Sequence, residues 1–207
     1  MLSSTELQAR FAKGLSYEQY RAHMQQNQAL MDALTPLVQL AADEERFFRM
    51  LPDRLRVLVV SEDWCPDCAL NVPILMKIVE HNAAFDVRFV GRDDNFDLLE
   101  FAAKGERKAI PTFFFFDERW NEVGHWVERP VRADALLLKW DRTHAAPDEP
   151  DRSADVWREY RRARSEHRNQ LFLQGGLWRD TLVELRAILS GERFSNVESA
   201  REPSLST

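Results

Sequence analysis

The chain has 207 residues, of which 44% are hydrophobic and 30% charged, and its formal net charge is −6. This composition is typical of a globular protein with a sizeable core, and the negative charge argues against general binding of nucleic acids or acidic membranes. No stretch of about 18 apolar residues predicts a membrane span, and the first residues lack the basic and apolar segments of a signal peptide. We therefore expect a cytoplasmic protein.

The first 50 residues are predicted to be helical. A Ser-x-x-Gln capping box at Ser16 starts one helix, and apolar residues at helical spacing extend it to about Leu34. Thr35 followed by Pro36 is typical of a helix start, so a further helix is expected to run to about Met50, just before a Pro-Asp breaker. These helices form an N-terminal extension.

The middle of the chain alternates between strands and helices. Its first two strands are joined by a helix and should be parallel, whereas its last two are joined by a tight turn and should be antiparallel. The sequence therefore predicts an α/β fold with a mixed four- to five-stranded sheet flanked by helices. The predicted strands are 56–60, 85–90, 112–116 and 122–128, and the predicted helices are 69–81, 96–104 and 133–140.

The C-terminal third is predicted to hold a linker at 145–151, a charged helix at 153–168 and an amphipathic helix at 177–189. The arginines of the charged helix, Arg168 included, are interpreted as solvent-facing, with a docking patch for an acidic partner as the alternative. We divide the chain into an N-terminal helical extension packed on the core, a central domain, a C-terminal helical extension and a disordered tail. These segments are 1–52, 53–140, 141–193 and 194–207.

Cys65 and Cys68 are the only two cysteines, and they lie between a predicted strand and a predicted helix. Cys65 falls at the start of the helix, where unpaired backbone N–H groups and the helix dipole stabilise a thiolate. Cys68 lies one turn further on the same face, and Pro66 suits the first turn because it has no N–H to leave unpaired. We predict that Cys65 is the nucleophile and Cys68 the resolving thiol of disulfide exchange.

Two other interpretations of the cysteine pair are weaker. A structural zinc site needs four ligands, but the chain has no second Cys-x-x-Cys pair and its five histidines are scattered without ligand spacing. Two inert buried cysteines remain an alternative. We expect no metal, and no cofactor other than the redox-active disulfide of Cys65 and Cys68.

Acidic residues surround the cysteine pair: Glu62 and Asp63 precede it and Asp67 lies inside it. Negative charge disfavours a neighbouring thiolate, and a less stable thiolate makes the dithiol a stronger reductant. The sequence therefore predicts a reducing couple.

Three motifs together resemble the thioredoxin family. Residues 64–68 match its Trp-Cys-x-x-Cys motif, Pro73 matches its helix proline, and 110–112 match its Ile-Pro-Thr segment, whose proline is cis. The resemblance covers about 53–140 and implies a thioredoxin fold, dithiol–disulfide exchange and a substrate groove beside the cysteines. The residues expected to bind substrate are Trp64, Pro66, Asp67, Ile110 and Pro111.

The chain departs from the family pattern at two places. Val59 and Phe89 stand where thioredoxins carry a buried aspartate and its lysine partner, which are thought to move protons from the resolving cysteine. The chain is also longer than a plain thioredoxin at both ends. It resembles a bacterial thioredoxin-like branch with the same five-residue motif and extra terminal helices.

Two functions remain open at this point. One is an enzyme that reduces protein or small-molecule disulfides and receives electrons from an unknown donor. The other is a thioredoxin-like adaptor whose helical extensions recognise a partner, with little reductase turnover. The N-terminal helices are expected either to cover the sheet or to form a homodimer interface.

Overall fold

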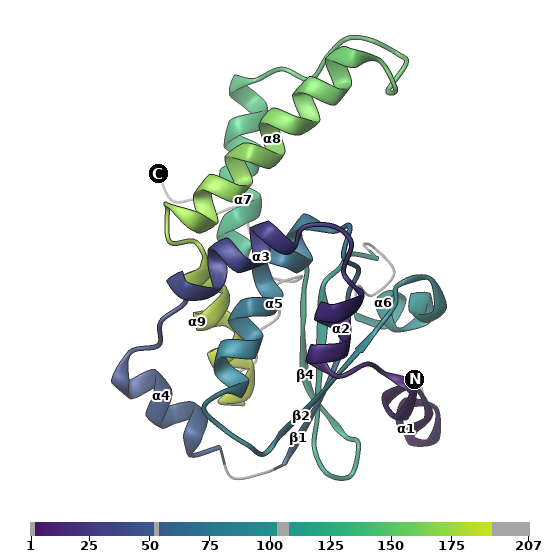
Figure 1. Cartoon of the computed structure of the whole chain (residues 1–207), viewed down its shortest axis with the longest axis vertical. Helices are drawn as coiled ribbons and strands as arrows, with labels where there is room; N and C mark the ends of the chain where they lie inside the picture. Colours follow the sequence, from purple (N-terminus) through teal and green to yellow (C-terminus); the bar gives the residue numbers. More distant parts are fainter. Residues whose placement is uncertain (1–2, 52–53, 103–107, 192–207) are drawn as a thin grey trace, which may run out of the picture.

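The computed structural model describes residues 3–51, 54–102 and 108–191 (Figure 1). A four-stranded sheet lies between two groups of helices. Its strands are β1 (Leu55–Val60), β2 (Phe85–Val90), β3 (Thr112–Phe116) and β4 (Glu122–Val127). The helices are α1 (Ser4–Lys13), α2 (Tyr17–His23), α3 (Gln28–Leu34), η1 (Thr35–Leu37), α4 (Ala42–Arg49), α5 (Pro66–Val79), η2 (Asp93–Asn95), α6 (Phe96–Ala102), α7 (Val131–Thr143), α8 (Asp155–Leu173) and α9 (Trp178–Leu189).

The sheet is mixed, as predicted, with the strand order β2-β1-β3-β4. β1 and β2 are parallel, and both the β1–β3 and β3–β4 pairs are antiparallel. Val59 and Phe89 are register partners and are both buried, so the pair of positions where thioredoxins are charged is apolar here. Leu15 exchanges two backbone hydrogen bonds of 2.9 Å with Phe89, which ties the N-terminal extension to the edge strand β2.

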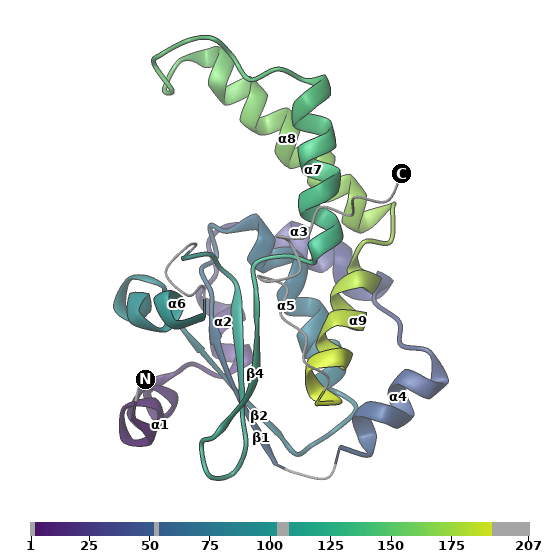
Figure 2. The same ribbon diagram turned by 180° about the vertical axis from the view of Figure 1, so that it is seen from behind.

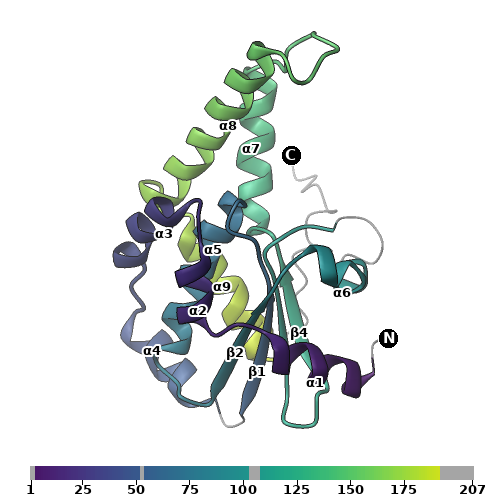
Figure 3. The same cartoon turned by 45° about the vertical axis from the view of Figure 1, so that its right-hand side comes forward.

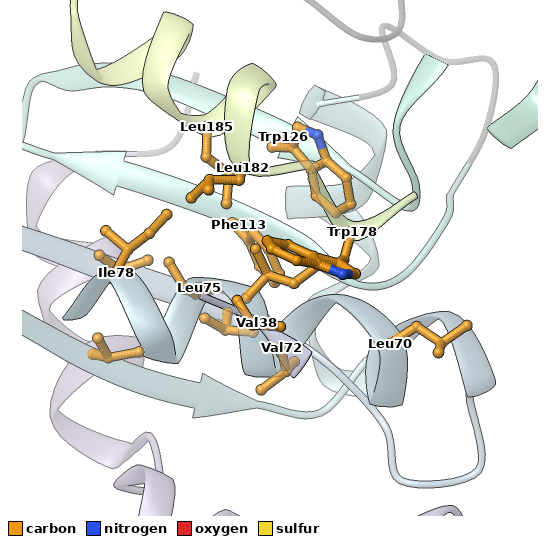
Figure 4. Close-up of a cluster of buried hydrophobic side chains, with 14 of the residues drawn as sticks. Val38, Leu70, Val72, Leu75, Ile78, Phe113, Trp126, Trp178, Leu182 and Leu185 are labelled. Carbon is orange, nitrogen blue, oxygen red and sulfur yellow. The ribbon is translucent and has the colours of Figure 1, made fainter. Parts of the chain in front are cut away.

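The larger core lies on the face of the sheet that is covered by α5 and α9 (Figure 4). Alternate residues of the strands point into it, since successive side chains of a strand face opposite sides. The core also takes side chains from both terminal extensions, so the extensions and the sheet share one packed interior. Fully buried members from the three regions include Met31, Phe113 and Leu185.

The opposite face of the sheet is covered by α1 and α6 (Figure 3). Leu58, Val60 and Phe114 point to this side and pack with Leu7 and Leu98. Because β1 and β3 are buried on both faces, their sequences are nearly continuous apolar runs. This explains why both strands could be recognised from sequence.

The N-terminal helices differ from the prediction in two respects. The capping box at Ser16 is present, but the helix that it starts ends at His23, and α3 begins separately at Gln28. The prediction of one continuous helix is wrong because Asp63 accepts hydrogen bonds from the backbone N–H groups of the intervening residues. The helix predicted to start at Thr35 is also wrong: only the short η1 forms there, and α4 begins later.

The hairpin of α7 and α8 projects away from the sheet (Figures 1 and 2). Asp141 of α7 joins the two helices by accepting two hydrogen bonds from Arg164, at 2.7 and 3.0 Å, and one from Tyr160 at 3.0 Å. The C-terminal part of α8 packs against the body of the protein. There Arg168 is only 8% exposed, so its interpretation as a solvent-facing residue is wrong.

Several predictions fall outside the described residues. These are the breaker at 52–53, the end of the predicted 96–104 helix and the tail at 194–207. Among the residues that the structure does describe, no helix is long and apolar enough to cross a membrane.

Candidate functional site

Cys65 lies between the end of β1 and the first turn of α5, as the sequence predicts. It occupies the N-cap of α5, and its Sγ accepts a hydrogen bond from the backbone N–H of Cys68 at 3.3 Å. Pro66 follows as the first residue of the helix, where a missing N–H leaves no bond unmade. A helix start with an N–H directed at the sulfur favours the negative charge of a thiolate.

The segment before β3 closes the other side of the site. The Ile110–Pro111 peptide bond is cis, which confirms the expectation from the sequence. The Cys65 thiol donates a hydrogen bond to the Ile110 carbonyl oxygen, 3.4 Å from Sγ. The Pro111 carbonyl oxygen accepts from the backbone N–H of Glu128 at 2.7 Å, so the residues after β4 hold this segment in place.

The side chains of the motif differ in their access to solvent. Trp64 is 43% exposed, whereas Cys65 is 6% and Cys68 0% exposed. The guanidinium of Arg92 lies 4.8 Å from the centre of a Trp64 ring, a cation–π contact that holds the indole at the rim of the site. A reaction partner would therefore meet Trp64 before it reaches Cys65.

The surroundings of Cys68 favour its protonated form. Burial raises the pKa of Cys68 well above its ordinary value, and its hydrogen bond with Cys65 acts in the same direction. The hydroxyl of Ser61 opposes this by lowering the pKa of Cys68 through a hydrogen bond. Ser61 is itself 2.9 Å from the hydroxyl oxygen of Tyr20, a residue of the N-terminal extension. Both hydroxyl side chains line a pocket of about 740 Å³ beside the site.

The two carboxylates that precede the cysteines are bound to backbone N–H groups. Asp63 accepts from Gln25 at 2.6 Å and from Gln26 at 3.2 Å, which fixes the chain between α2 and α3. Glu62 accepts from the N–H of Arg92 at 2.7 Å. These contacts compensate part of each negative charge, so its effect on a nearby thiolate is smaller than that of a free carboxylate.

Asp67 points away from the surface and is only 5% exposed. Its Oδ2 accepts hydrogen bonds from Arg129 and Arg168, both at 3.1 Å. Among the residues expected to bind substrate, Trp64 and Pro66 are the neighbours of Cys65 in the chain, and Ile110 accepts its hydrogen bond. Trp64 is exposed and Pro66 is partly buried, whereas Asp67, Ile110 and Pro111 are buried.

The sequence analysis did not assign four residues that line this site. They are Tyr20, Ser61, Arg129 and Arg168. A signal existed for Arg168, because it shares a helix face with the buried Phe172 one turn later. None existed for the others, since their contacts depend on packing between distant segments. Within the residues that the structure describes, no cluster of three or more His, Cys, Asp or Glu side chains could hold a metal ion.

Comparisons with known proteins agree with this fold. The family profile described as thioredoxin matches residues 14–146. No curated protein matches the chain. An HIV epitope-scaffold is similar in fold, with 22% identity and a TM-score of 0.64, over 92% of this chain and 99% of the scaffold. A Pseudomonas aeruginosa protein of unknown function also has 22% identity, with a TM-score of 0.62 and the same coverage of both chains.

Proposed function

The chain belongs to the thioredoxin family, and on this basis we propose that it is a thiol–disulfide oxidoreductase. Its substrates would be disulfides of proteins or small molecules. Cys65 would act as the nucleophile and Cys68 as the resolving thiol. The observation that carries the proposal is the placement of Cys65 Sγ at the start of α5, 3.3 Å from the N–H of Cys68 and beside the cis Pro111.

The reaction would take place in two exchange steps. The Cys65 thiolate attacks one sulfur of the substrate disulfide and forms a mixed disulfide, and the other substrate sulfur leaves and takes up a proton. Cys68 then loses its proton and attacks Cys65 Sγ, which releases the second substrate sulfur as a thiol. The substrate has gained two electrons and two protons, and the Cys65–Cys68 disulfide returns to the dithiol when an external thiol donor reduces it.

The surroundings of the cysteines support this division of roles. The resolving thiol should stay protonated until the mixed disulfide has formed, and burial raises the pKa of Cys68 accordingly. We propose that Trp64, Pro66, Ile110 and Pro111 form the groove that receives the substrate, with the half-exposed indole at its entrance. Protein disulfides and an electron donor would be the partners, in the cytoplasm.

We also propose that the chain represents a bacterial branch of the family with the same five-residue motif and helical additions at both ends. The helices α1 to α4 before the sheet and α8 and α9 after it support this assignment. Both groups contribute side chains to the main core. The additions would thus be integral parts of the enzyme.

Turnover of a disulfide substrate tests the proposed function. The wild-type protein, reduced by a dithiol, should catalyse the reduction of insulin or of a small aromatic disulfide well above the rate of the dithiol alone. Cys65→Ser should abolish this turnover. Cys68→Ser should retain the first step and accumulate mixed disulfides, whose partners identify the substrates. Equal rates for the wild type and Cys65→Ser would refute the proposal.

The alternative is a binding module whose extensions recognise a partner. The apolar Val59–Phe89 pair favours it, because the charged pair of thioredoxins is thought to assist general reductase turnover. This alternative predicts negligible turnover together with a partner that stays bound to Cys65→Ser.

A further inference from the structure

A buried charge cluster connects the cysteine motif to the C-terminal extension. Asp67 lies between the two cysteines in the first turn of α5. One of its oxygens, Oδ2, accepts from Arg129, just after β4, and from Arg168 in α8, which is 101 residues further along the chain. All three residues are at most 8% exposed.

A contribution to stability is a weak explanation for this buried cluster. Removing ions from water costs several kcal/mol each, and replacing a buried ion pair by apolar residues often leaves a protein as stable or more so. Within the described residues, the other oxygen of Asp67, Oδ1, is buried and accepts no hydrogen bond. Buried charges with incomplete partners that lie next to reactive groups are candidates for a functional role.

Asp67 and the Cys65 thiolate carry charges of the same sign. The carboxylate is two residues from the thiolate, in a helix turn whose N–H groups would otherwise favour the sulfur anion. An uncompensated carboxylate here would oppose formation of the reactive nucleophile. A nearby cation is needed to cancel it.

Two cations lie against Asp67, Arg129 and Arg168. Arg129 shares its charge among Asp67, Glu128 and Asp134. Arg168 forms its ion pair with Asp67, and its other hydrogen bonds go to neutral groups, the Ser165 hydroxyl at 2.7 Å and the Asn169 side-chain oxygen at 3.5 Å. Among the described residues, Asp67 is thus the carboxylate with which Arg168 forms an ion pair.

The other charged groups around the motif have separate partners. Glu62 and Asp63 are bound by backbone N–H groups of Arg92, Gln25 and Gln26. The guanidinium of Arg92 lies over Trp64 and forms an ion pair with Asp93. These groups stay unchanged when Arg168 is replaced, so its effect can be isolated.

We propose that Arg168 is a positioning residue of the dithiol site: it neutralises Asp67 and so keeps Cys65 available as the thiolate. The C-terminal helix α8 thereby controls the reactivity and the reduction potential of the cysteine pair. This inference rests on the proposed function, because it assigns α8 a role in disulfide exchange.

Two single variants and the charge-balanced double variant test the proposal. For each protein, the rate at which iodoacetamide alkylates Cys65 is measured as a function of pH by mass spectrometry. Arg168→Gln should move the midpoint of this profile upward by about half a pH unit or more, because it leaves Asp67 undercompensated. Asp67→Asn should move it downward, because it removes a negative charge from the helix turn that holds Cys65. The double variant should return it to the wild-type value. The reduction potential of the Cys65–Cys68 pair, measured by equilibration with glutathione, should also become more negative in Arg168→Gln.

The matched control is Arg164→Gln. Arg164 lies in α8, like Arg168, but its ion pair is with Asp141 of α7. This variant should leave the alkylation profile unchanged. If Arg168→Gln does not fold, Arg168→Lys should keep the wild-type midpoint, and Asp67→Asn alone still gives a shift of known sign. Unchanged midpoints in Asp67→Asn and Arg168→Gln, or shifts of the same sign in these two variants, overturn the proposal.

The alkylation experiment does not depend on turnover. If the wild type does not reduce disulfides, the proposed function is wrong. The midpoints of the alkylation profiles still decide, in that case, whether Arg168 compensates the charge of Asp67. Normal turnover together with unchanged midpoints would defeat only the role of Arg168.

Discussion

Ser61 should assist the proposed resolving thiol, because its hydroxyl lowers the pKa of the buried Cys68. Ser61→Ala removes this hydrogen bond and should raise the pKa of Cys68 further. Resolution then slows, and the mixed disulfide at Cys65 should live about threefold to tenfold longer, which matches a net hydrogen-bond contribution of about 1 kcal/mol. Acid quenching followed by mass spectrometry measures this lifetime.

Tyr20→Phe is the control for this prediction. It removes the hydroxyl that lies 2.9 Å from Ser61 but leaves the Ser61 hydroxyl itself in place. Its effect on the lifetime should be smaller. Equal lifetimes for Ser61→Ala and the wild type would show that the hydroxyl plays no part in resolution.

Glu184 should make the stability of the protein depend on pH. Burial raises the pKa of this carboxyl from 4.5 to about 7, although it accepts hydrogen bonds from Trp126 Nε1 at 2.7 Å and the N–H of Val131 at 2.8 Å. Below pH 4.5 the carboxyl is protonated in both states. Between pH 4.5 and 7 only the folded state keeps this proton, so the free energy of unfolding falls as the pH rises, and the loss is complete once the pH has passed 7.

The free energy of unfolding should therefore fall between pH 5 and pH 8 by an amount on the order of 2 kcal/mol from this group. Glu184→Gln cannot ionise and should flatten this part of the profile. Urea denaturation at several pH values measures it. A variant that keeps the full wild-type slope would assign the pH dependence to other groups.

At the scale of single elements, α9 is predicted to be essential for stability. Leu182 of this helix is 1% exposed and packs near Trp126 and Leu185 (Figure 4). Leu182→Ala should reduce the free energy of unfolding by about 2–5 kcal/mol, because it removes buried methyl groups and leaves a cavity. Urea denaturation measures this loss. The control is Val183→Ala at the next residue, which is 60% exposed, so this variant should change the free energy of unfolding little. Similar losses in both variants would contradict this packing.

The strands could be predicted from sequence because local signals determine them. β1 and β3 are apolar runs of strand length, and the Asp117–Asn121 turn specifies the hairpin of β3 and β4. The break between α2 and α3 could not be predicted, because it depends on hydrogen bonds to the distant Asp63. For Arg168 the burial had a local signal, its position on the helix face of Phe172, but its ion pair with the distant Asp67 had none.

In the candidate site, too, features within short stretches of sequence could be predicted, whereas contacts between distant segments could not. The spacing of Cys65 and Cys68, the Ile110–Pro111 segment and the helix start were all visible in short stretches of sequence. The charge environment of the motif was not visible, since its compensation comes from four separate segments of the chain. The sequence therefore identified the residues of the candidate site, and only the fold showed which charged groups surround them.

At the scale of the whole molecule, the shared core predicts cooperative unfolding. The larger core contains Met31 from the N-terminal extension, Phe113 from the sheet and Leu185 from the C-terminal extension. None of these regions can be removed without exposing the others, so urea should unfold the chain in one transition. Circular dichroism and tryptophan fluorescence should give the same midpoint, and two separate transitions would show that the extensions fold independently.

The central claim is that Cys65 attacks a disulfide and Cys68 resolves the product. The most direct measurement is rapid acid quenching of the reduced protein after mixing with a disulfide-bonded peptide, followed by mass spectrometry of the cysteine adducts. The account predicts a transient peptide adduct on Cys65, then an intramolecular Cys65–Cys68 disulfide and two free peptide thiols. A first adduct on Cys68, or no adduct on either cysteine, would contradict it.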